Sequence, residues 1–322
     1  MISMAKKITM AMGDKNTTIS QGFELFIRVK KMSNLAEDSI YYYERCYKPF
    51  QEFFGEDFLC ENLNTDNILE YIEHLKCSGD RKSITINTHI RGIRAILYYF
   101  MERKYTEHFK IQQIRFQKPI KETFTDEEID KLIEKPDINN CSFAQFRNWA
   151  IACYMFATGN RLSTIQNLKL SDINIENMEI TLRHTKNKKT YIIPMSSSLR
   201  EVLKEYLLVR GGTSEDYLFC TVHGNKFSND GLGDAIEDYN NSRGVLKTGL
   251  HIYRHTFAKN WIRQGGDIFR LQKMLGHSSL EMVKQYVNMF SEDLKENFDK
   301  VNTLDKHRAN VVQQKVLKMK RK

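Results

Sequence analysis

Residues 251–286 read HIYRHTFAKNWIRQGGDIFRLQKMLGHSSLEMVKQY, and this stretch guides the interpretation of the whole sequence. It holds His251 and Arg254 in an HxxR pattern, a Leu-Gly-His triplet ending at His277, and Tyr286 nine residues later. Each feature is weak alone, because an isolated HxxR usually belongs to a solvated surface and a lone helical tyrosine is usually packed. Their order and spacing carry the signal.

Two segments upstream complete the set. Arg161 ends ATGNR at residues 157–161, just past the end of a predicted helix. Lys186 lies in the basic turn of a hairpin predicted from the β-rich segments 179–182 and 190–193. Taken singly, the arginine would be a charge at a helix C-terminus and the lysine part of a solvated turn.

The N-terminal region carries helical patterns only. Apolar residues recur about one turn apart in each segment, and Thr65 is the predicted N-cap of the third. We therefore expect a small all-helical bundle. Its four segments are 17–32, 39–54, 65–76 and 83–104.

The second region mixes helices with a few strands. A capping box of Thr125 and Glu128 predicts a helix over residues 126–134. Further helices are expected near 143–157 and 162–168, and a candidate third strand lies at 217–219, after which the chain is helical again. The predicted fold class is mainly α with a small antiparallel β-sheet (α+β).

The composition limits the classes of function. Lys and Arg total 49 against 40 Asp and Glu, a net charge of +9 that suits a nucleic-acid partner, although many basic proteins bind none. The six cysteines form no CxxC pair or zinc-spaced Cys/His cluster, so we expect reduced thiols and no metal. The sequence lacks an ATP-binding P-loop, a signal peptide and a bilayer-length apolar run, which favours a cytoplasmic protein.

Together the motifs resemble the tyrosine recombinase family of phage integrases, Xer proteins and Cre, over about residues 17 to 290. The resemblance implies a site-specific DNA recombinase with a helical core-binding (SAM-like) domain and a catalytic domain. It implies a 3′-phosphotyrosyl intermediate formed without metal, cofactor or ATP, used in integration, excision or resolution of a mobile element or chromosome. By position, the residues that match the family's catalytic set are Arg161, Lys186, His251, Arg254, His277 and Tyr286.

The resemblance also implies a role for each of these residues. Arg161 and Arg254 would clamp the phosphate, because a guanidinium is a permanently protonated bidentate donor. Tyr286 would be the nucleophile and His251 its general base. The remaining roles are a phosphate contact for His277 and the general acid for Lys186.

Two positions depart from the family's pattern. Thr164 stands where an acidic residue is often found, three positions after the first arginine. Val283 stands where a threonine is common, three positions before the nucleophile. Neither position does the chemistry, but the first leaves open how Arg161 is held in place.

The predicted organisation has five parts. They are a flexible N-terminus (1–16), a core-binding domain (17–105), a linker (106–122), a catalytic domain (123–298) and a basic tail (299–322). The tail carries apolar residues at near-helical spacing. It could fold back on its own domain or be disordered, or it could dock on a neighbouring protomer, as the resemblance favours.

Several residues outside the catalytic set are candidates for DNA contact. Arg91 and Arg94 lie one turn apart, near Asn87, and form either a solvated face or, given the resemblance, a DNA-binding face. The other expected phosphate contacts are Lys118 and Lys121 in the linker and Lys188 and Lys189 in the hairpin turn.

The expected partners are double-stranded DNA core sites and further copies of the chain, forming dimers and a tetrameric synapse on the nucleoid. An accessory DNA-bending or directionality protein could also take part, and no membrane partner is expected. Two alternatives stay open. The first is a type IB topoisomerase, which shares the catalytic set, but the segment from LGH to Tyr286 in this chain looks like that of an integrase. The second is a non-catalytic DNA-binding regulator on the same fold, and the six intact active-site residues argue against it.

Overall fold

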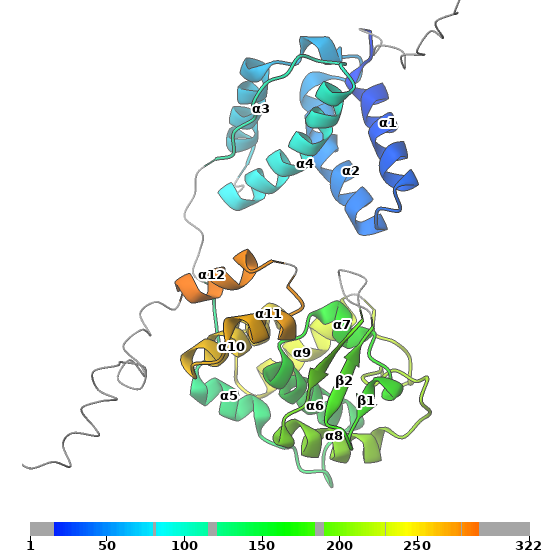
Figure 1. Cartoon of the computed structure of the whole chain (residues 1–322), viewed down its shortest axis with the longest axis vertical. Coiled ribbons are helices and arrows are strands. Elements are labelled where there is room, and N and C mark those ends of the chain that lie inside the picture. The colour runs from blue at the N-terminus through cyan, green and yellow to red at the C-terminus, as the bar shows by residue number, and fades with distance from the viewer. Residues whose placement is uncertain are drawn as a thin grey trace, which may run out of the picture. The chain divides into compact units, whose positions relative to one another are not determined.

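The computed structural model describes residues 16–79, 82–114, 121–183, 190–228, 230–277 and 279–289, except for the side chains of residues 285 and 287–289. The chain divides into two compact units, Met1–Lys118 and Pro119–Lys322 (Figure 1). The division falls inside the segment predicted as a linker. The predicted flexible N-terminus, apart from its last residue, and the predicted basic tail lie outside the described residues.

Helices form the described part of unit 1, as the sequence predicted, apart from its loops and one isolated bridge between Thr18 and Leu59. The N-cap of its third helix is Asn64 rather than the predicted Thr65, because the Asn64 side chain accepts the backbone N–H groups of Asp66 and Asn67. The elements are α1 (Ile19–Met32), α2 (Glu37–Phe54), the 3₁₀ turn η1 (Cys60–Asn62), α3 (Thr65–Cys77) and α4 (Ser83–Glu102).

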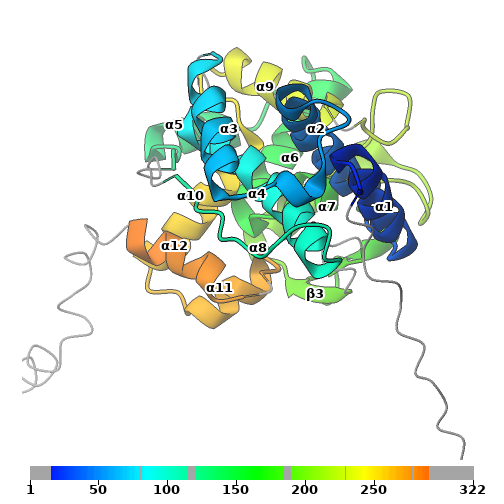
Figure 2. The same ribbon diagram turned by 90° about the horizontal axis from the view of Figure 1, so that it is seen from above.

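Aromatic side chains fill much of the core of unit 1. Phe23 stacks on Tyr47 with 3.8 Å between ring centroids and 9° between planes, and Phe26 meets Tyr43 edge to face at 5.0 Å. These rings join α1 to α2, and α2 packs in turn against α4 (Figure 2). The bundle therefore has its own buried core and holds α4 as one of its fixed elements.

Unit 2 combines helices with one small sheet in its described part, which confirms the predicted fold class. The helical elements before the last strand are α5 (Asp126–Ile133), α6 (Phe143–Thr158), α7 (Leu162–Gln166) and the 3₁₀ turn η2 (Leu170–Asp172). The strands are β1 (Ile173–Asn174), β2 (Glu179–Leu182) and β3 (Tyr191–Pro194). The remaining helices are α8 (Ser197–Arg210), α9 (Gly231–Ser242), α10 (Leu250–Arg263), α11 (Ile268–Met274) and α12 (Glu281–Met289).

The sheet is antiparallel with strand order β1-β2-β3. The predicted hairpin is present, since Ile180 pairs with Ile193 across β2 and β3. The predicted third strand at residues 217–219 is wrong, because Tyr217 forms only an isolated bridge to Lys169. The third strand is β1, whose two residues are defined by pairing with β2 rather than by a pattern of their own.

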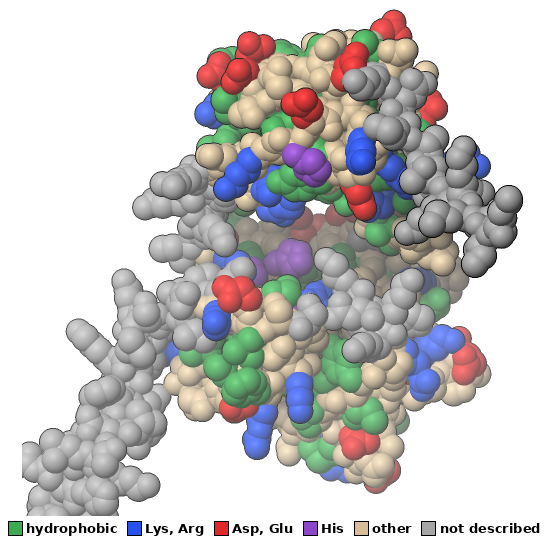
Figure 3. Space-filling model, turned by 45° about the horizontal axis from the view of Figure 1, so that its top comes forward, with side chains coloured by type: hydrophobic (Ala, Val, Ile, Leu, Met, Phe, Trp, Pro, Cys, Tyr) green, Lys and Arg blue, Asp and Glu red, His purple; other side chains and the backbone are tan. Residues whose placement is uncertain are grey.

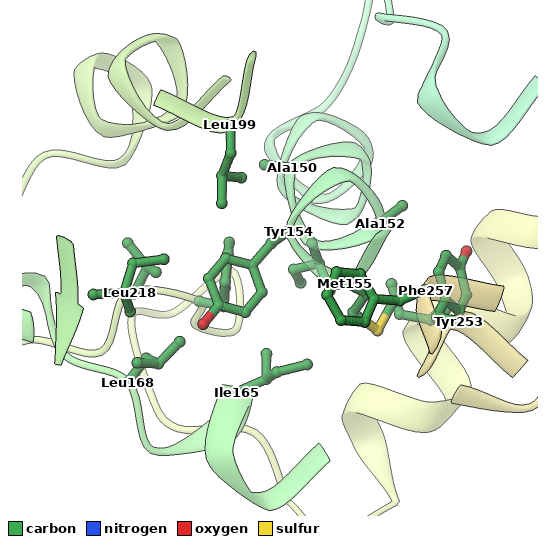
Figure 4. Close-up of a cluster of buried hydrophobic side chains, with 14 of the residues drawn as sticks. Ala150, Ala152, Tyr154, Met155, Ile165, Leu168, Leu199, Leu218, Tyr253 and Phe257 are labelled. Atoms are coloured by element: carbon green, nitrogen blue, oxygen red, sulfur yellow. The ribbon is translucent and has the colours of Figure 1, made fainter. Parts of the chain in front are cut away.

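Helix α6 lies at the centre of the core of unit 2, where it contacts α5, α8, α9 and α10. Figure 4 shows Tyr154 and Met155 of α6 among side chains from α7, α8 and α10. Gly159 ends the helix in the left-handed conformation, with φ of 60°, and a side chain there would run into Phe257. This abrupt end places Arg161 at the start of α7.

A membrane-spanning helix is absent from the described residues, since none of their helices is both long and apolar enough.

Candidate active site

Two arginine side chains from different helices meet at one backbone carbonyl. Arg254, on α10, donates from Nη1 to the carbonyl of Gly159 and from Nη2 to that of Leu275, both at 2.8 Å. Arg161 donates from Nη1 to the carbonyls of Leu275 and Gly276, both at 3.3 Å. The carbonyl of Leu275, just past α11, therefore anchors both guanidinium groups.

The described hydrogen-bond partners of these two arginines do not neutralise their positive charge. Their described acceptors are three carbonyls, the ring of His277 and the hydroxyl of Tyr286, none of which carries a negative charge. Arg254 is only 5% exposed, and burial, with a smaller contribution from Arg161, lowers its pKa to about 10. It still carries a proton at neutral pH, so the pair favours an anion such as a phosphate.

The acidic residue that often follows the first arginine of the family is replaced by Thr164, which is buried in α7. Arg161 is instead held by the carbonyls of Leu275 and Gly276. The structure thus answers the question left open by the sequence, because neutral carbonyls fix the guanidinium without cancelling its charge.

His277 completes the group around Arg254. Its Nε2 lies 2.6 Å from Arg254 Nη2, so this nitrogen accepts the hydrogen bond and the ring is neutral. Burial, followed by the charges of Arg254 and Arg161, lowers the pKa of His277 to about 3. Its Nδ1 is buried and has no hydrogen-bond partner among the described residues.

Tyr286, on α12, points its hydroxyl into this cationic group. The side chain is 3% exposed, and its Oη lies 3.1 Å from Nδ1 of His255. Its ring is parallel to that of His277 within 8°, with centroids 6.3 Å apart. Burial raises the pKa of Tyr286, while Arg254 and Arg161 oppose the increase. The tyrosine therefore keeps its proton until it reacts.

Lys121, predicted as a linker contact to DNA, lies against the tyrosine. Its Nζ is 4.8 Å from the centre of the Tyr286 ring, within the range of a cation–π contact. Its charge also helps to lower the pKa of His251, His255 and His277, although desolvation by the surrounding protein is the largest cause in each case. Lys121 thus adds a further positive charge to the same site.

The structure brings together five of the six predicted catalytic residues. They are Arg161, His251, Arg254, His277 and Tyr286. The sixth, Lys186, lies in the 184–189 segment outside the described residues, as do Lys188, Lys189 and Lys118.

The sequence interpretation missed His255, which is the histidine in contact with the tyrosine hydroxyl. A signal for it existed. His251 and His255 are four residues apart on α10 and therefore lie on the same face of the helix, and their ring centroids are 6.4 Å apart. Which of the two meets the tyrosine depends on how α12 packs, which the sequence spacing does not reveal.

Of the three residues predicted to form a DNA-binding face on α4, two remain candidates and one does not. Arg91 is exposed, and Arg94 donates to the hydroxyl of Tyr98 at 3.2 Å. The expectation for Asn87 is corrected, because its side chain is 2% exposed. Its amide nitrogen donates to the carbonyl of Ile114, and its amide oxygen accepts from the backbone N–H of the same residue. Asn87 fixes the segment that follows α4 and is not free to contact DNA.

Charged side chains are unevenly spread over unit 1. In the view of Figure 3 its Asp and Glu side chains gather mainly at the top, with Lys and Arg lower down.

Within the described residues, no group of three or more His, Cys, Asp or Glu side chains could hold a metal ion.

Comparison with known proteins establishes the class. The phage integrase family matches residues 122–292, more than half of the 322-residue sequence. The chain therefore belongs to the phage integrase family. The prediction of a tyrosine recombinase is confirmed at this level.

Individual relatives agree with this assignment. Tyrosine recombinase XerD of Oceanobacillus iheyensis is 24% identical over 291 residues, covering 86% of this chain and 96% of the relative. Tyrosine recombinase XerA of Pyrococcus furiosus is 29% identical over 259 residues, covering 79% and 87%.

Solved structures show the same fold at low sequence identity. The Tn1549 transposon integrase in complex with a circular intermediate DNA gives a TM-score of 0.69 at 18% identity, covering 84% of this chain and 94% of that one. A lambda integrase tetramer bound to a Holliday junction gives 0.65 at 15% identity, covering 85% and 78%.

Proposed function

We propose that this tyrosine recombinase cuts and rejoins duplex DNA through a 3′-phosphotyrosyl intermediate on Tyr286. The observation that carries the proposal is a buried tyrosine hydroxyl beside two arginines whose acceptors, described above, carry no negative charge. A DNA phosphate would supply the missing charge. We place the activity in integration, excision or resolution of a mobile element or chromosome.

The chemistry follows from the charges. Attack on a phosphodiester builds up negative charge on the non-bridging oxygens, which Arg161 and Arg254 can stabilise with donors already in place. His277 accepts from Arg254 and so helps to hold that guanidinium at the phosphate. The tyrosine oxygen replaces the 5′ oxygen of the DNA, so the energy of the phosphodiester bond is kept for rejoining. In this proposal Lys186 protonates the departing 5′ oxygen.

The first experiment tests the nucleophile. The site at which the wild-type protein cleaves a duplex is mapped first, and a nicked form of that duplex is then used to trap the covalent adduct. We expect Tyr286→Phe to bind this DNA but form no adduct, because only the phenolic oxygen is removed. Tyr217→Phe, outside the site, should form the adduct normally. Covalent trapping by Tyr286→Phe would overturn the proposal.

A second experiment tests the general acid. Lys186→Ala should slow cleavage of ordinary DNA by roughly 100-fold or more, the range that general acid catalysis contributes. It should have little effect on DNA with a 5′-bridging sulfur, because sulfur leaves without a proton. Equal slowing on both substrates would show that Lys186 only contacts phosphate.

Assembly and partners belong to the same proposal. The lambda integrase neighbour is a tetramer on a Holliday junction, and we propose that this chain likewise works as dimers and a tetramer on DNA core sites. Exchange of strands between two labelled duplexes would separate a recombinase from a type IB topoisomerase, which only relaxes supercoils. A DNA-binding regulator would give neither product.

A further inference from the structure

The hydroxyl of Tyr286 has a specific neighbour. Nδ1 of His255 lies 3.1 Å from the tyrosine oxygen, and the two ring centroids are 5.5 Å apart. His255 is half-buried on α10, directly after Arg254, whereas Tyr286 comes from α12, which packs against α10. The contact therefore joins the reactive oxygen to the helix that carries the phosphate clamp.

The histidine expected from the sequence to act as the base lies one helical turn away. His251 is in the first turn of α10, with its ring centroid 6.4 Å from that of His255. The side chain of His251 is exposed, but neighbouring atoms partly desolvate its ring, and this desolvation together with Arg254, Arg161 and Lys121 lowers its pKa. His251 therefore lies within the same cationic field. The histidine that hydrogen-bonds the tyrosine hydroxyl, however, is His255.

We propose that His255, rather than His251, accepts the hydroxyl proton when Tyr286 attacks the phosphate. This inference rests on the proposed role of Tyr286 as the nucleophile. The oxygen of Tyr286 forms the new bond to phosphorus, the bond from phosphorus to the 5′ oxygen breaks, and the hydroxyl proton moves to Nδ1 of His255. During rejoining the 5′ hydroxyl attacks phosphorus and gives its proton to Lys186, the group that protonates this oxygen in the proposed function. The bond from phosphorus to the tyrosine oxygen breaks, and His255 returns its proton to that oxygen.

Nδ1 of His255 must carry a lone pair before the reaction, and the surroundings keep it unprotonated. The pKa of His255 is lowered to about 4, mainly by burial and then by the charges of Lys121, His251 and Arg254. Tyr286 is the titratable group that faces it from α12. A bound phosphate would offset these positive charges and raise the pKa of His255 toward neutrality, which makes it a better proton acceptor in the complex.

The hydrogen bond can be tested without DNA. In protein with ¹⁵N-labelled histidine, we expect His255 to show a protonated Nε2 and an unprotonated Nδ1 at pH 7. Tyr286→Phe should shift the Nδ1 resonance of His255 and leave the resonances of His251 almost unchanged. A larger shift at His251, or a protonated Nδ1 on His255, would overturn the proposal. Because no cleavage is involved, this result is independent of whether Tyr286 is the nucleophile.

The proton transfer is tested by single-turnover cleavage of the mapped duplex across a range of pH. His255→Asn keeps a hydrogen-bonding atom near the position of Nδ1 but cannot take up a proton, and His255→Gln reaches only toward Nε2. We expect both to slow cleavage by about 100- to 10,000-fold and to remove the fall in rate at low pH. His251→Asn should be slower than wild type but should keep that fall.

Each outcome of this comparison decides the question. Loss of the low-pH fall in both His255 variants, with normal DNA binding and normal circular dichroism, supports the assignment. Retention of the fall in either folded His255 variant, or its loss in His251→Asn alone, assigns the base to another group. A Tyr286→Phe protein that still forms an adduct would remove the proposed nucleophile, which is a different failure.

Discussion

Gly276 shows how strictly a single residue can control the site. It has φ of 59°, and a side chain there would overlap the hydroxyl of Tyr191 at the start of β3. Its carbonyl also accepts from Arg161, and His277 follows it directly. The backbone at this point therefore sets the positions of both an arginine and a histidine.

We predict that Gly276→Ala lowers the free energy of unfolding by about 1–3 kcal/mol, from the left-handed backbone and the overlap together. It should also reduce adduct formation. Adding Tyr191→Phe should recover part of the stability, because the closest overlapping atom is removed. Urea unfolding of the two single variants and the double variant measures this coupling, and strict additivity would contradict the predicted overlap.

A second prediction at this scale concerns pH. The folded protein holds the pKa of His255 near 4 and that of His277 near 3, whereas in the unfolded chain both lie near 6.5. Between these values the unfolded state binds more protons, so the free energy of unfolding falls as pH drops from about 6.5 toward 4. Each histidine contributes at most about 1.4 kcal/mol per pH unit, and less where solvent screens it.

This pH effect is measured by urea unfolding at pH 7, 6 and 5. His277→Gln should flatten the dependence relative to wild type, since glutamine has no proton to gain. His223→Gln, at an exposed position outside the site, is the control. Parallel curves for wild type and His277→Gln would show that the depressed pKa of His277 is not linked to folding.

At the scale of single elements, α4 is the helix whose outer side we propose to face DNA. Arg91→Ala combined with Arg94→Ala should weaken binding and reduce the slope of log K against log salt by about 0.9 for each phosphate that is no longer neutralised. Lys76→Ala, exposed on α3, is the comparison. An unchanged affinity and slope would mean that this side of α4 is only solvated.

Local patterns explain which elements were predictable. The capping box of Thr125 and Glu128 was correctly identified because both partners lie within one helical turn. Helix α8 was missed although Ser196 caps it and Leu199, Leu203 and Tyr206 form its buried stripe. That signal was present in the sequence, whereas β1 exists only through its pairing with β2, which a local pattern does not contain.

The site divides in the same way. The residue types and their order in the chain identified the two arginines, His277 and Tyr286 as a group. The contact of His255 with the tyrosine and the replacement of an acidic partner by carbonyls depend on how α11 and α12 pack on α10. Such contacts between distant elements are not encoded in spacing along the sequence.

For the whole molecule, each unit has a buried core of its own. We predict that a fragment of residues 119–322 folds alone and still forms the Tyr286 adduct, because the arginines, histidines and tyrosine all belong to it. Its affinity for DNA should fall and its salt slope should decrease, since α4 is missing. Calorimetry and adduct formation on the mapped duplex test this, and a fragment that stays unfolded would show that the units depend on each other.

The carbonyl of Leu275 accepts hydrogen bonds from both Arg161 and Arg254. A change in the backbone at this one position therefore affects both arginines. A shift of the end of α11 by the length of one hydrogen bond would therefore weaken the anchoring of both guanidinium groups at once, although Arg254 would keep its bond to the carbonyl of Gly159. One displacement of the backbone would thus loosen both arginines of the phosphate clamp in the same step.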